Sequence, residues 1–296
     1  MSSHSPLLAG SIVVSIARRH YRVLELLGEG GFGHVFKARC QEDGELVAIK
    51  FPKTDQDSRQ FDDEITLYRQ LAHPQLAALL DWGAHFAVFE LLHGRTLREH
   101  LIKEGAIAAI TARAPMLHVL EALIYLHEHG VVHCDVKPHN IMIVDEGAKL
   151  FDLGSALMMA PGTPGGRLFS PAYSAPEQLL GAPPSTKFDL YAWGLVWLEC
   201  LAGQPVFAGP NVERLYRQQI AGDEVPLPAP LIGHPLGELL RTVLHKDPRQ
   251  RAGDAQQLYR QLLDINLRDI PRGVGVGAYR YDQSTQPLPS RSDVTG

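Results

Sequence analysis

The 296-residue sequence predicts an α+β fold with two lobes, an antiparallel β-sheet lobe with one helix followed by a mainly α-helical lobe. Apolar and polar residues alternate through most of residues 21–91, whereas apolar residues recur at i, i+3 and i+4 spacing after Gly94. The boundary between the lobes therefore falls near residue 92. Apolar residues make up 45% of the chain, which is enough to build a buried core.

Short alternating runs predict the antiparallel strands of the first lobe. Glu42-Asp43-Gly44 forms a turn between two of these runs. One segment has helical spacing instead and ends at His73-Pro74, because proline disfavours a helical residue before it. In chain order, we expect strands over 21–27, 35–39, 45–50 and 84–91, with the helix over 61–71 before the last strand.

Helical spacing predicts the elements of the second lobe, and Gly130 follows the longest of them as a C-terminal cap signal. A helix needs such a signal because its last carbonyl groups have no partner within the helix. The expected helices cover 96–102, 113–129, 188–201, 237–244 and 255–263.

Both ends of the chain differ in composition from the middle. Residues 1–20 begin as a serine-rich, weakly patterned leader. Residues 271–296 combine glycine and proline with polar residues, which predicts a disordered tail. A single domain is therefore expected over 21–270, with lobes over 21–91 and 92–270.

Charge and composition exclude several function classes. The formal net charge of -5 argues against nucleic-acid binding, which needs a basic face. No apolar run approaches the roughly 20 residues that span a bilayer, so we expect no membrane span. Cys40, Cys134 and Cys200 are few and far apart, which is typical of free thiols in a reducing cytosol. None of them has a neighbouring ligand for zinc.

The most informative motif is His133-Cys134-Asp135-Val136-Lys137-Pro138-His139-Asn140, followed twelve residues later by Asp152-Leu153-Gly154. It combines two carboxylates, a lysine and a carboxamide, which are the groups that a metal-bridged nucleotide requires. Their order resembles the catalytic loop and metal-binding motif of eukaryotic-type (Hanks-type) protein kinases. Compact loops are similar to those of bacterial members. The resemblance implies a bilobal protein-kinase-like fold.

The resemblance also implies a role for each polar residue of the motif. Asp135 would align the substrate hydroxyl, and Lys137 would contact the γ-phosphoryl group of ATP. Asn140 and Asp152 would ligate Mg²⁺, with Mn²⁺ as a substitute. His133 would be structural. Leu153 replaces the commoner phenylalanine, a swap of similar volume that should leave metal binding unchanged.

The glycine pattern Gly28-x-Gly30-x-x-Gly33 is a weak signal alone, because a flexible turn has the same composition. A dinucleotide-binding fold would need a helix after it, whereas 35–39 alternates as a strand. By resemblance the loop would cover phosphates with backbone N–H groups. Its expected nucleotide contacts are Gly28, Gly30, Gly31, Phe32, Gly33 and Val35.

The rest of the nucleotide site follows from position in the family pattern. Lys50 would hold the α- and β-phosphates and pair with Glu64, which we prefer over Asp62 and Asp63 as its counter-ion. The position of those two aspartates at the start of the helix is explained by their favourable interaction with the helix dipole. The adenine pocket would comprise Phe89 at the rear, the Glu90 carbonyl and Leu92 amide at the edge, Val35 and Ala48 above, and Met142 below.

The downstream motifs indicate a protein substrate. Ser170 to Glu177 resembles the substrate-binding segment and Ala-Pro-Glu motif of protein kinases, and Asp189 and Arg251 match two structural positions, Arg251 as the partner of Glu177. Small-molecule kinases of the aminoglycoside or choline type generally lack these motifs, which favours a protein substrate over a small molecule. A small-molecule phosphotransferase and a pseudokinase scaffold are the two alternatives. Lys137 and Ser170 favour serine/threonine over tyrosine substrates. We expect Mg-ATP as the cofactor, and we expect the protein to phosphorylate itself as well as its substrates. The sequence makes no prediction of the oligomeric state.

Cys134 departs from the family, because most members carry at this position an arginine that pairs with a phosphorylated activation loop. A neutral thiol cannot make that pair, so the chain is expected to be a non-RD kinase whose activity does not depend strongly on such phosphorylation. A small buried thiol is favoured over a redox role. The expected location is cytoplasmic, with a secreted effector acting in a host cytosol as the alternative. Candidate phosphosites are Ser155, Thr163, Ser170 and Ser174.

Overall fold

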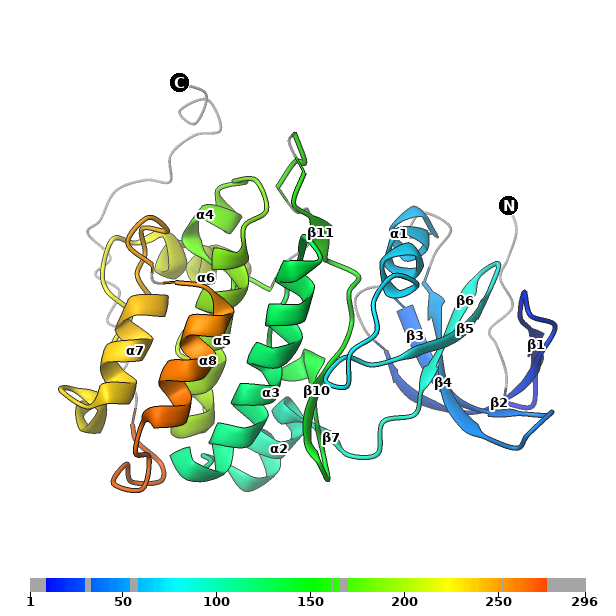
Figure 1. The fold of residues 1–296 in the computed structure, drawn as a ribbon, viewed down its shortest axis with the longest axis horizontal. Helices are drawn as coiled ribbons and strands as arrows, with labels where there is room; N and C mark the ends of the chain where they lie inside the picture. Colours follow the sequence, from blue (N-terminus) through cyan, green and yellow to red (C-terminus); the bar gives the residue numbers. More distant parts are fainter. Residues whose placement is uncertain are drawn as a thin grey trace.

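The two-lobed α+β architecture is confirmed: a curled antiparallel sheet with one helix adjoins a larger helical lobe (Figure 1). Helix α1 lies on the side of the sheet that faces the helical lobe, and the segment after β6 joins the two lobes. The computed structural model describes residues 9–29, 33–53, 58–160, 162–165, 170–251 and 253–275.

The sheet has six strands in the order β1-β2-β3-β4-β6-β5, and every neighbouring pair is antiparallel. Phe61 and Ile65 of α1 pack on Ala87 of the sheet, which places that helix against it. The sheet strands and this helix are β1 (Ile12–Val14), β2 (His20–Glu29), β3 (Gly33–Cys40), β4 (Leu46–Pro52), α1 (Ser58–Tyr68), β5 (Leu79–Gly83) and β6 (Phe86–Glu90).

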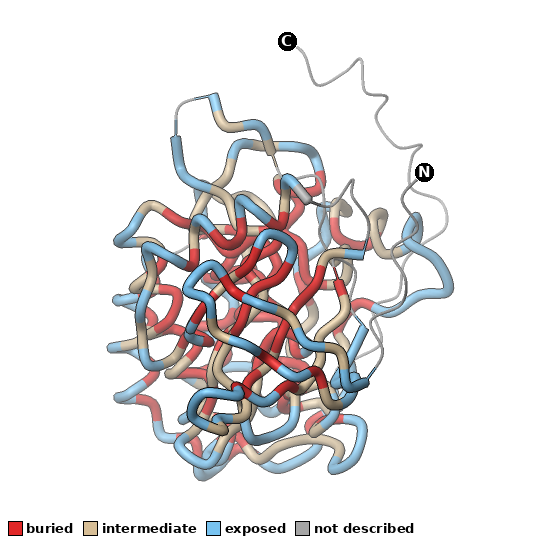
Figure 2. The backbone as a smooth tube through the Cα atoms, turned by 90° about the vertical axis from the view of Figure 1, so that its right-hand side faces the viewer, coloured by how far each residue is buried: buried red, intermediate tan, exposed pale blue. Residues whose placement is uncertain are grey.

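The helical lobe is built around α3 and α5, which pack against each other. Trp193 and Trp197 of α5 are fully buried, and the Trp193 indole donates a 3.0 Å hydrogen bond to the Met116 carbonyl of α3. Figure 2 shows buried stretches running through the middle of the molecule. The helices are α2 (Leu97–Glu104), α3 (Ala109–Glu128), α4 (Pro176–Leu179), α5 (Thr186–Ala202), α6 (Val212–Ile220), α7 (Pro235–Val243) and α8 (Ala255–Asp264), with 3₁₀ turns η2 (Pro138–Asn140) and η3 (Ala229–Leu231).

Helix boundaries follow from capping residues. Thr96 caps α2 in a capping box with Glu99, each side chain bonding the other's backbone N–H. Ser185 caps the start of α5, and Gly203 ends it in the left-handed conformation that glycine adopts without strain. Short strands of the second lobe flank the polar residues of the motif over 133–154. They are β7 (Arg95–Thr96), β8 (Val131–Val132), β9 (Ile141–Val144), β10 (Gly147–Leu150) and β11 (Leu157–Met158).

Helix α3 is the longest apolar helix in the part of the chain that the structure describes. A window of 18 of its 20 residues is apolar enough to cross a membrane by length and composition alone. Half of that window is buried, however, and α3 packs against α5, α8 and β10. Its apolar composition is therefore accounted for by its place at the centre of the helical lobe.

The described chain also extends beyond the predicted domain limits at both ends. Within the expected leader, β1 pairs with β2, and the Ile16 N–H donates a 2.9 Å bond to the Trp82 carbonyl. Within the expected tail, Val274 is buried and the Arg272 guanidinium bonds the Glu104 and Ala106 carbonyls. The leader and tail expectations therefore need correction over residues 9–20 and 271–275. The rest of both segments lies outside the described residues.

Tyr21 of β2 connects two strands that are not neighbours in the sheet, β2 and β5. Its hydroxyl donates a 2.9 Å hydrogen bond to Asp81 Oδ2, and both residues are buried. We expect Tyr21→Phe to lower the free energy of unfolding by about 1.5–3 kcal/mol, because a buried carboxylate loses a partner. Chemical denaturation measures this change. Tyr259→Phe is the control, since the half-buried Tyr259 donates a comparable bond to Glu121 (2.9 Å); an equal loss in both variants would contradict the argument.

Candidate active site

Asp189, in the first turn of α5, anchors the backbone of the predicted catalytic loop. Its fully buried carboxylate accepts hydrogen bonds from the His133 N–H (2.9 Å) and the Cys134 N–H (2.8 Å). His127 Nε2 lies 2.8 Å from the same carboxylate. These contacts hold Cys134 at a φ of 65°, which few residues other than glycine adopt. The loop therefore takes its shape from the core helix of the lobe.

His133 connects the loop to the segment that carries Asp152. The fully buried ring accepts the Asp135 N–H at Nδ1 (3.3 Å), and Nε2 lies 3.3 Å from the Phe151 carbonyl. Both contacts are satisfied together when Nε2 carries the proton. A ring held in this way at both nitrogens positions two backbone segments, which agrees with the structural role expected of it.

Asp135, Lys137, Asn140 and Ser170 converge on one point of the loop. Lys137 Nζ lies 2.6 Å from Asp135 Oδ2 and donates a 2.8 Å bond to Ser170 Oγ. The Asn140 amide nitrogen donates to the Asp135 carbonyl (2.9 Å) and to its Oδ2 (3.2 Å). Because its nitrogen is used within the loop, Asn140 presents its amide oxygen as the group available to a cation.

Lys50 links both lobes through two carboxylates. Its Nζ lies 2.7 and 2.8 Å from the oxygens of Glu64 in α1, and 2.8 Å from Asp152 Oδ1. The predicted choice of counter-ion therefore agrees with the structure, in which Asp62 and Asp63 are exposed. Two carboxylates share one ammonium, so this cluster has an excess of negative charge that a cation beside Asp152 would neutralise.

Burial and charge act in opposite directions on this cluster. Burial opposes the charge on Lys50, but the Asp152 and Glu64 carboxylates outweigh it and raise the pKa of Lys50. Burial likewise opposes the charge on Asp152, but Lys50 outweighs it and lowers the pKa of that carboxyl group. Burial raises the pKa of Glu64 to about 7 even though Lys50 acts against it. Lys50 and Asp152 are therefore held in their charged forms.

The donor set at Asp152 fits a hard cation that also binds phosphate. Within the described residues, no group of three or more His, Cys, Asp or Glu side chains forms a ready metal cage. Mg²⁺ usually binds through one or two carboxylates and completes its shell with water and substrate phosphates. The Asp152 carboxylate and the Asn140 amide oxygen have the chemistry that this mode requires.

Two glycines allow close approaches of backbone near the predicted nucleotide site. A Cβ on Gly33, in β3, would lie 2.1 Å from the Phe51 carbonyl oxygen of β4. A Cβ on Gly94, between the lobes, would lie 1.9 Å from the Ile143 carbonyl oxygen. Gly28 lies in β2 with open space around it. Gly30, Gly31 and Phe32 lie outside the described residues.

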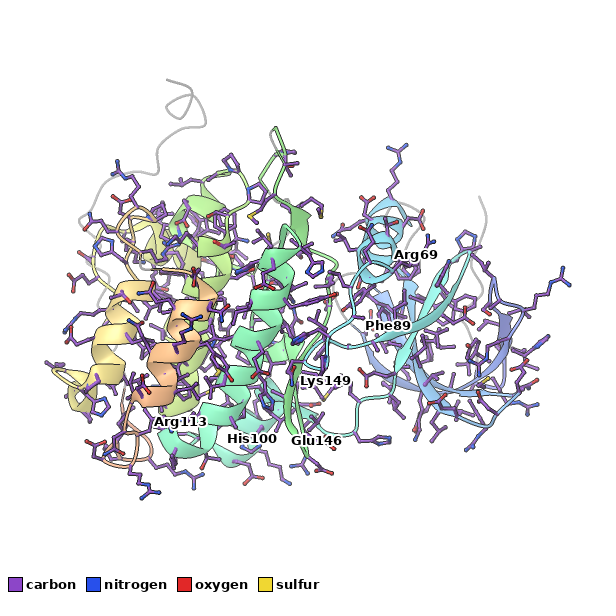
Figure 3. The ribbon with its side chains drawn as sticks, viewed as in Figure 1. Arg69, Phe89, His100, Arg113, Glu146 and Lys149 are labelled. Carbon is purple, nitrogen blue, oxygen red and sulfur yellow. The ribbon has the colours of Figure 1, made fainter. Side chains whose placement is uncertain are left out.

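The predicted adenine-binding residues lie on both sides of the connection between the lobes. Val35 and Ala48 come from β3 and β4, Phe89 and Glu90 from the end of β6, and Met142 from β9. All of them, and Leu92, are only half-buried. The carboxylate of Glu90 does not point freely into solvent, because Lys149 of β10, labelled in Figure 3, pairs with it at 2.6 and 2.8 Å.

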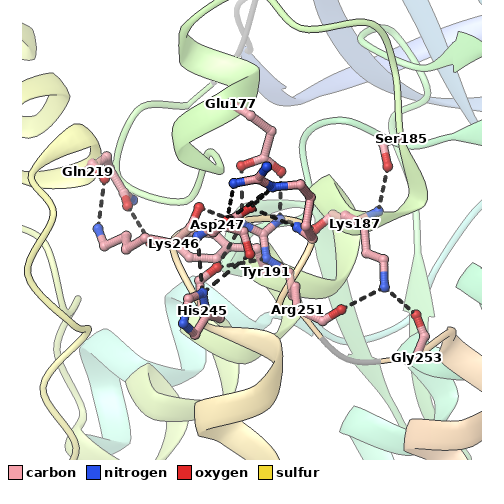
Figure 4. A network of polar contacts seen from close by, with 11 residues as sticks. Glu177, Ser185, Lys187, Tyr191, Gln219, His245, Lys246, Asp247, Arg251 and Gly253 are labelled. Carbon is pink, nitrogen blue, oxygen red and sulfur yellow. Dashed lines mark hydrogen bonds and ion pairs between the residues drawn. The ribbon is translucent and has the colours of Figure 1, made fainter.

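Glu177 and Arg251 form the predicted ion pair, shown in Figure 4. The guanidinium approaches the two carboxylate oxygens at 2.6 and 3.1 Å, and its side chain is 0% exposed. It also donates to the carbonyls of Lys187 (2.9 Å) and His245 (2.9 and 3.0 Å). This pair fastens α4, which follows the predicted substrate-binding segment, to the region before α8.

The four candidate phosphosites differ in accessibility. Ser155 and Ser174 are buried, and the Ser174 hydroxyl donates to the Ser170 carbonyl at 3.0 Å. Ser170 is half-buried and bound by Lys137, and Thr163 is half-buried. The structure therefore argues against Ser155 and Ser174 as sites that a second molecule could phosphorylate without rearrangement.

Sequence reasoning missed four contacts that shape this region. Tyr68 accepts a hydrogen bond from the Asp152 N–H (3.1 Å), and Lys149 pairs with Glu90. The fully buried Glu199 of α5 binds Arg98 (3.0 Å) and Tyr173 (2.7 Å). Only Tyr68 carried a usable signal, since it follows Glu64 by one helical turn and must lie on the same face.

Similarity to known proteins agrees with this geometry. Residues 21–263 match the protein kinase domain. A "probable serine/threonine-protein kinase" of Clostridium perfringens is 30% identical over 270 residues, which cover 86% of this chain and 39% of that protein. Serine/threonine-protein kinase PknA of Mycobacterium tuberculosis is 32% identical over 249 residues, covering 78% and 58%. The chain thus spans less than two thirds of the length of these relatives. It belongs to the protein kinase domain family.

Proposed function

We propose that the chain is a serine/threonine protein kinase that transfers the γ-phosphoryl group of Mg-ATP to hydroxyls of proteins, itself included. The observation that carries this proposal is the Lys50–Glu64–Asp152 cluster, placed by His133 next to the Asp135–Lys137–Asn140 loop. Members of the family generally use ATP and a divalent metal and act on proteins. The names of the relatives support serine/threonine specificity.

Each side chain has a role that its contacts support. Lys50, oriented by Glu64, binds the α- and β-phosphates, and Asn140 with Asp152 holds Mg²⁺, which neutralises phosphate charge when bound. Asp135 accepts a hydrogen bond from the substrate hydroxyl and aligns it for in-line attack. Lys137, between Asp135 and Ser170, stabilises charge on the transferred group.

A peptide platform favours protein over small-molecule substrates. The Glu177–Arg251 pair holds the end of the segment from Ser170 to Glu177 in place, and the Tyr173–Glu199 bond holds its middle. Such fixed backbone beside the catalytic loop offers an extended chain a surface for docking.

The test is incubation of the purified protein with Mg²⁺, γ-labelled ATP and a generic basic protein, followed by phosphoamino-acid analysis. We expect label on serine and threonine. Asp135→Asn should lower it by about 10²–10⁴-fold, because the hydroxyl loses its acceptor. Asp145→Asn, an exposed carboxylate in the same lobe, should match the parent. Label on small molecules only would favour the small-molecule alternative, and no transfer at all would favour a scaffold.

We also propose that activity does not depend strongly on activation-segment phosphorylation. The Cys134 thiol is buried, 3.5 Å from the Val132 carbonyl, and offers a phosphate no charge. Backbone pairing of β8 with β11, and a 2.7 Å bond from the Met159 N–H to the Gly130 carbonyl, hold the start of the segment instead.

Replacing both Ser155 and Thr163 by alanine should therefore change the transfer rate by less than about threefold, since the neutral thiol makes no phosphate-dependent pair. The measurement is the initial rate on a protein substrate. A large loss in the double variant, with recovery by aspartate at the same positions, would contradict the proposal.

A cytoplasmic location remains a proposal as well. It is supported by Cys40, Cys134 and Cys200, which are all buried free thiols. Such thiols persist in a reducing compartment.

A further inference from the structure

Tyr68 makes a contact that the proposed mechanism does not use. It is the last residue of α1 and is 3% exposed. Its phenol oxygen accepts a 3.1 Å hydrogen bond from the backbone N–H of Asp152, 84 residues away. Its ring packs edge-on against Phe89 of β6, with 4.9 Å between centroids and 69° between planes (Phe89 is labelled in Figure 3). The ring is therefore fixed while its oxygen reaches the other lobe.

The backbone that Tyr68 contacts is in an unusual conformation. Asp152 has a φ of 68°, in the left-handed region that residues other than glycine rarely adopt. Such a conformation persists when neighbouring contacts hold it. The Tyr68 oxygen supplies one such contact at the N–H of Asp152, and Lys50 holds the carboxylate at 2.8 Å.

Two residues of helix α1 therefore help to position Asp152. Glu64 acts on the Asp152 carboxylate through Lys50, and Tyr68, one helical turn later, acts on its backbone. Burial raises the pKa of Tyr68 far above its usual value, and the hydroxyl therefore stays protonated in any ordinary assay.

We propose that Tyr68 is a positioning residue, whose phenol oxygen holds the backbone N–H of Asp152 and thereby orients the Asp152 carboxylate for the divalent metal. The inference rests on the proposed function, because it assigns Asp152 as a metal ligand. Groups that orient a metal ligand typically change metal affinity by 10- to 100-fold when they are removed.

The test is Tyr68→Phe, which keeps the ring and its contact with Phe89 and removes only the oxygen. We expect the Mg²⁺ concentration for half-maximal transfer to rise about tenfold, with little change in the KM for the protein substrate. Tyr125→Phe is the matched control. The Tyr125 hydroxyl also accepts a hydrogen bond from a backbone N–H, but from that of Ala72 (2.9 Å) and not from that of Asp152. Its Mg²⁺ dependence should equal that of the parent.

A second readout needs no turnover. Titration of Mn²⁺ against protein with a non-hydrolysable ATP analogue, followed by electron paramagnetic resonance, should show weaker Mn²⁺ binding in Tyr68→Phe than in Tyr125→Phe. This titration tests Tyr68 even if the parent transfers no phosphate, so failure of the proposed function is distinguishable. Unchanged Mn²⁺ affinity in Tyr68→Phe, or equal losses in both variants, overturns the proposal.

Phe89→Leu serves if Tyr68→Phe does not fold. It leaves the hydroxyl and removes the ring that fixes it. Because Phe89 also belongs to the predicted adenine pocket, Mn²⁺ is titrated with the ATP analogue at saturation, and its affinity should then fall in the same direction by a smaller factor. A Phe89→Leu protein with parental Mn²⁺ affinity would count against the proposal.

Discussion

Asp152→Asn is expected to lower the rate of phosphoryl transfer about 10³-fold, the size of effect seen when a charge-stabilising group is removed from a reaction centre. Asparagine tolerates the left-handed backbone of this position (φ 68°), so the fold should persist. The loss should arise because the amide carries no charge for the metal, and because Lys50 then has only Glu64 as an anionic partner.

Initial rates with saturating Mg-ATP measure this effect, and thermal unfolding confirms that the variant is folded. Asp62→Asn is the control, because this carboxylate is exposed on α1 two residues before Glu64. If the Asp152→Asn protein kept roughly a tenth or more of the parental rate, the assignment of Asp152 as a metal ligand would be wrong.

Arg251→Ala is expected to lower the free energy of unfolding by about 3–5 kcal/mol, because removing one member of a buried ion pair leaves the other charge unpaired. Arg251 is 0% exposed, and it also bonds the Lys187 and His245 carbonyls. In the variant, the Glu177 carboxylate and these two carbonyl groups would all lose the hydrogen-bond donor that Arg251 provides. The segment that leads to Glu177 should lose its anchor before the rest of the lobe unfolds.

Arg249→Ala is a control two residues away. Arg249 also pairs with a carboxylate, that of Asp247 at 2.7 Å, but its side chain is 88% exposed. We expect a change of only about 0–1 kcal/mol there, since solvent screens the pair. Urea denaturation of both variants gives the comparison. Similar losses in the two would show that burial of Arg251 is not what stabilises the helical lobe.

The predictable part of this protein is the part with regular spacing. Alternating strands, helical stripes and the motif residues located both lobes and the pairs Lys50–Glu64 and Glu177–Arg251. Those pairs were predictable because residue types at family positions indicate partners that are far apart in the chain.

The features that were not predicted depend on contacts between distant segments. The strand β1 has only three residues, too few for a periodic signal, and it is fixed by β2 and by the Ile16–Trp82 bond. In β5, the buried Asp81 interrupts the apolar pattern, and its carboxylate accepts a hydrogen bond from Tyr21 of β2, a strand that is not its neighbour in the sheet. Helical spacing places Tyr68 on the same face of α1 as Glu64, but that spacing does not indicate that the Tyr68 oxygen would meet the backbone of Asp152.

The most direct test of the central claim is to count products in one reaction. ADP and phosphoserine plus phosphothreonine should form in equal amounts from Mg-ATP and a protein acceptor. Both should disappear in Asp152→Asn, while Tyr259→Phe forms them at the parental ratio. ADP formation without phosphorylated serine or threonine, or equal product formation by Asp152→Asn and the parent, would contradict the account.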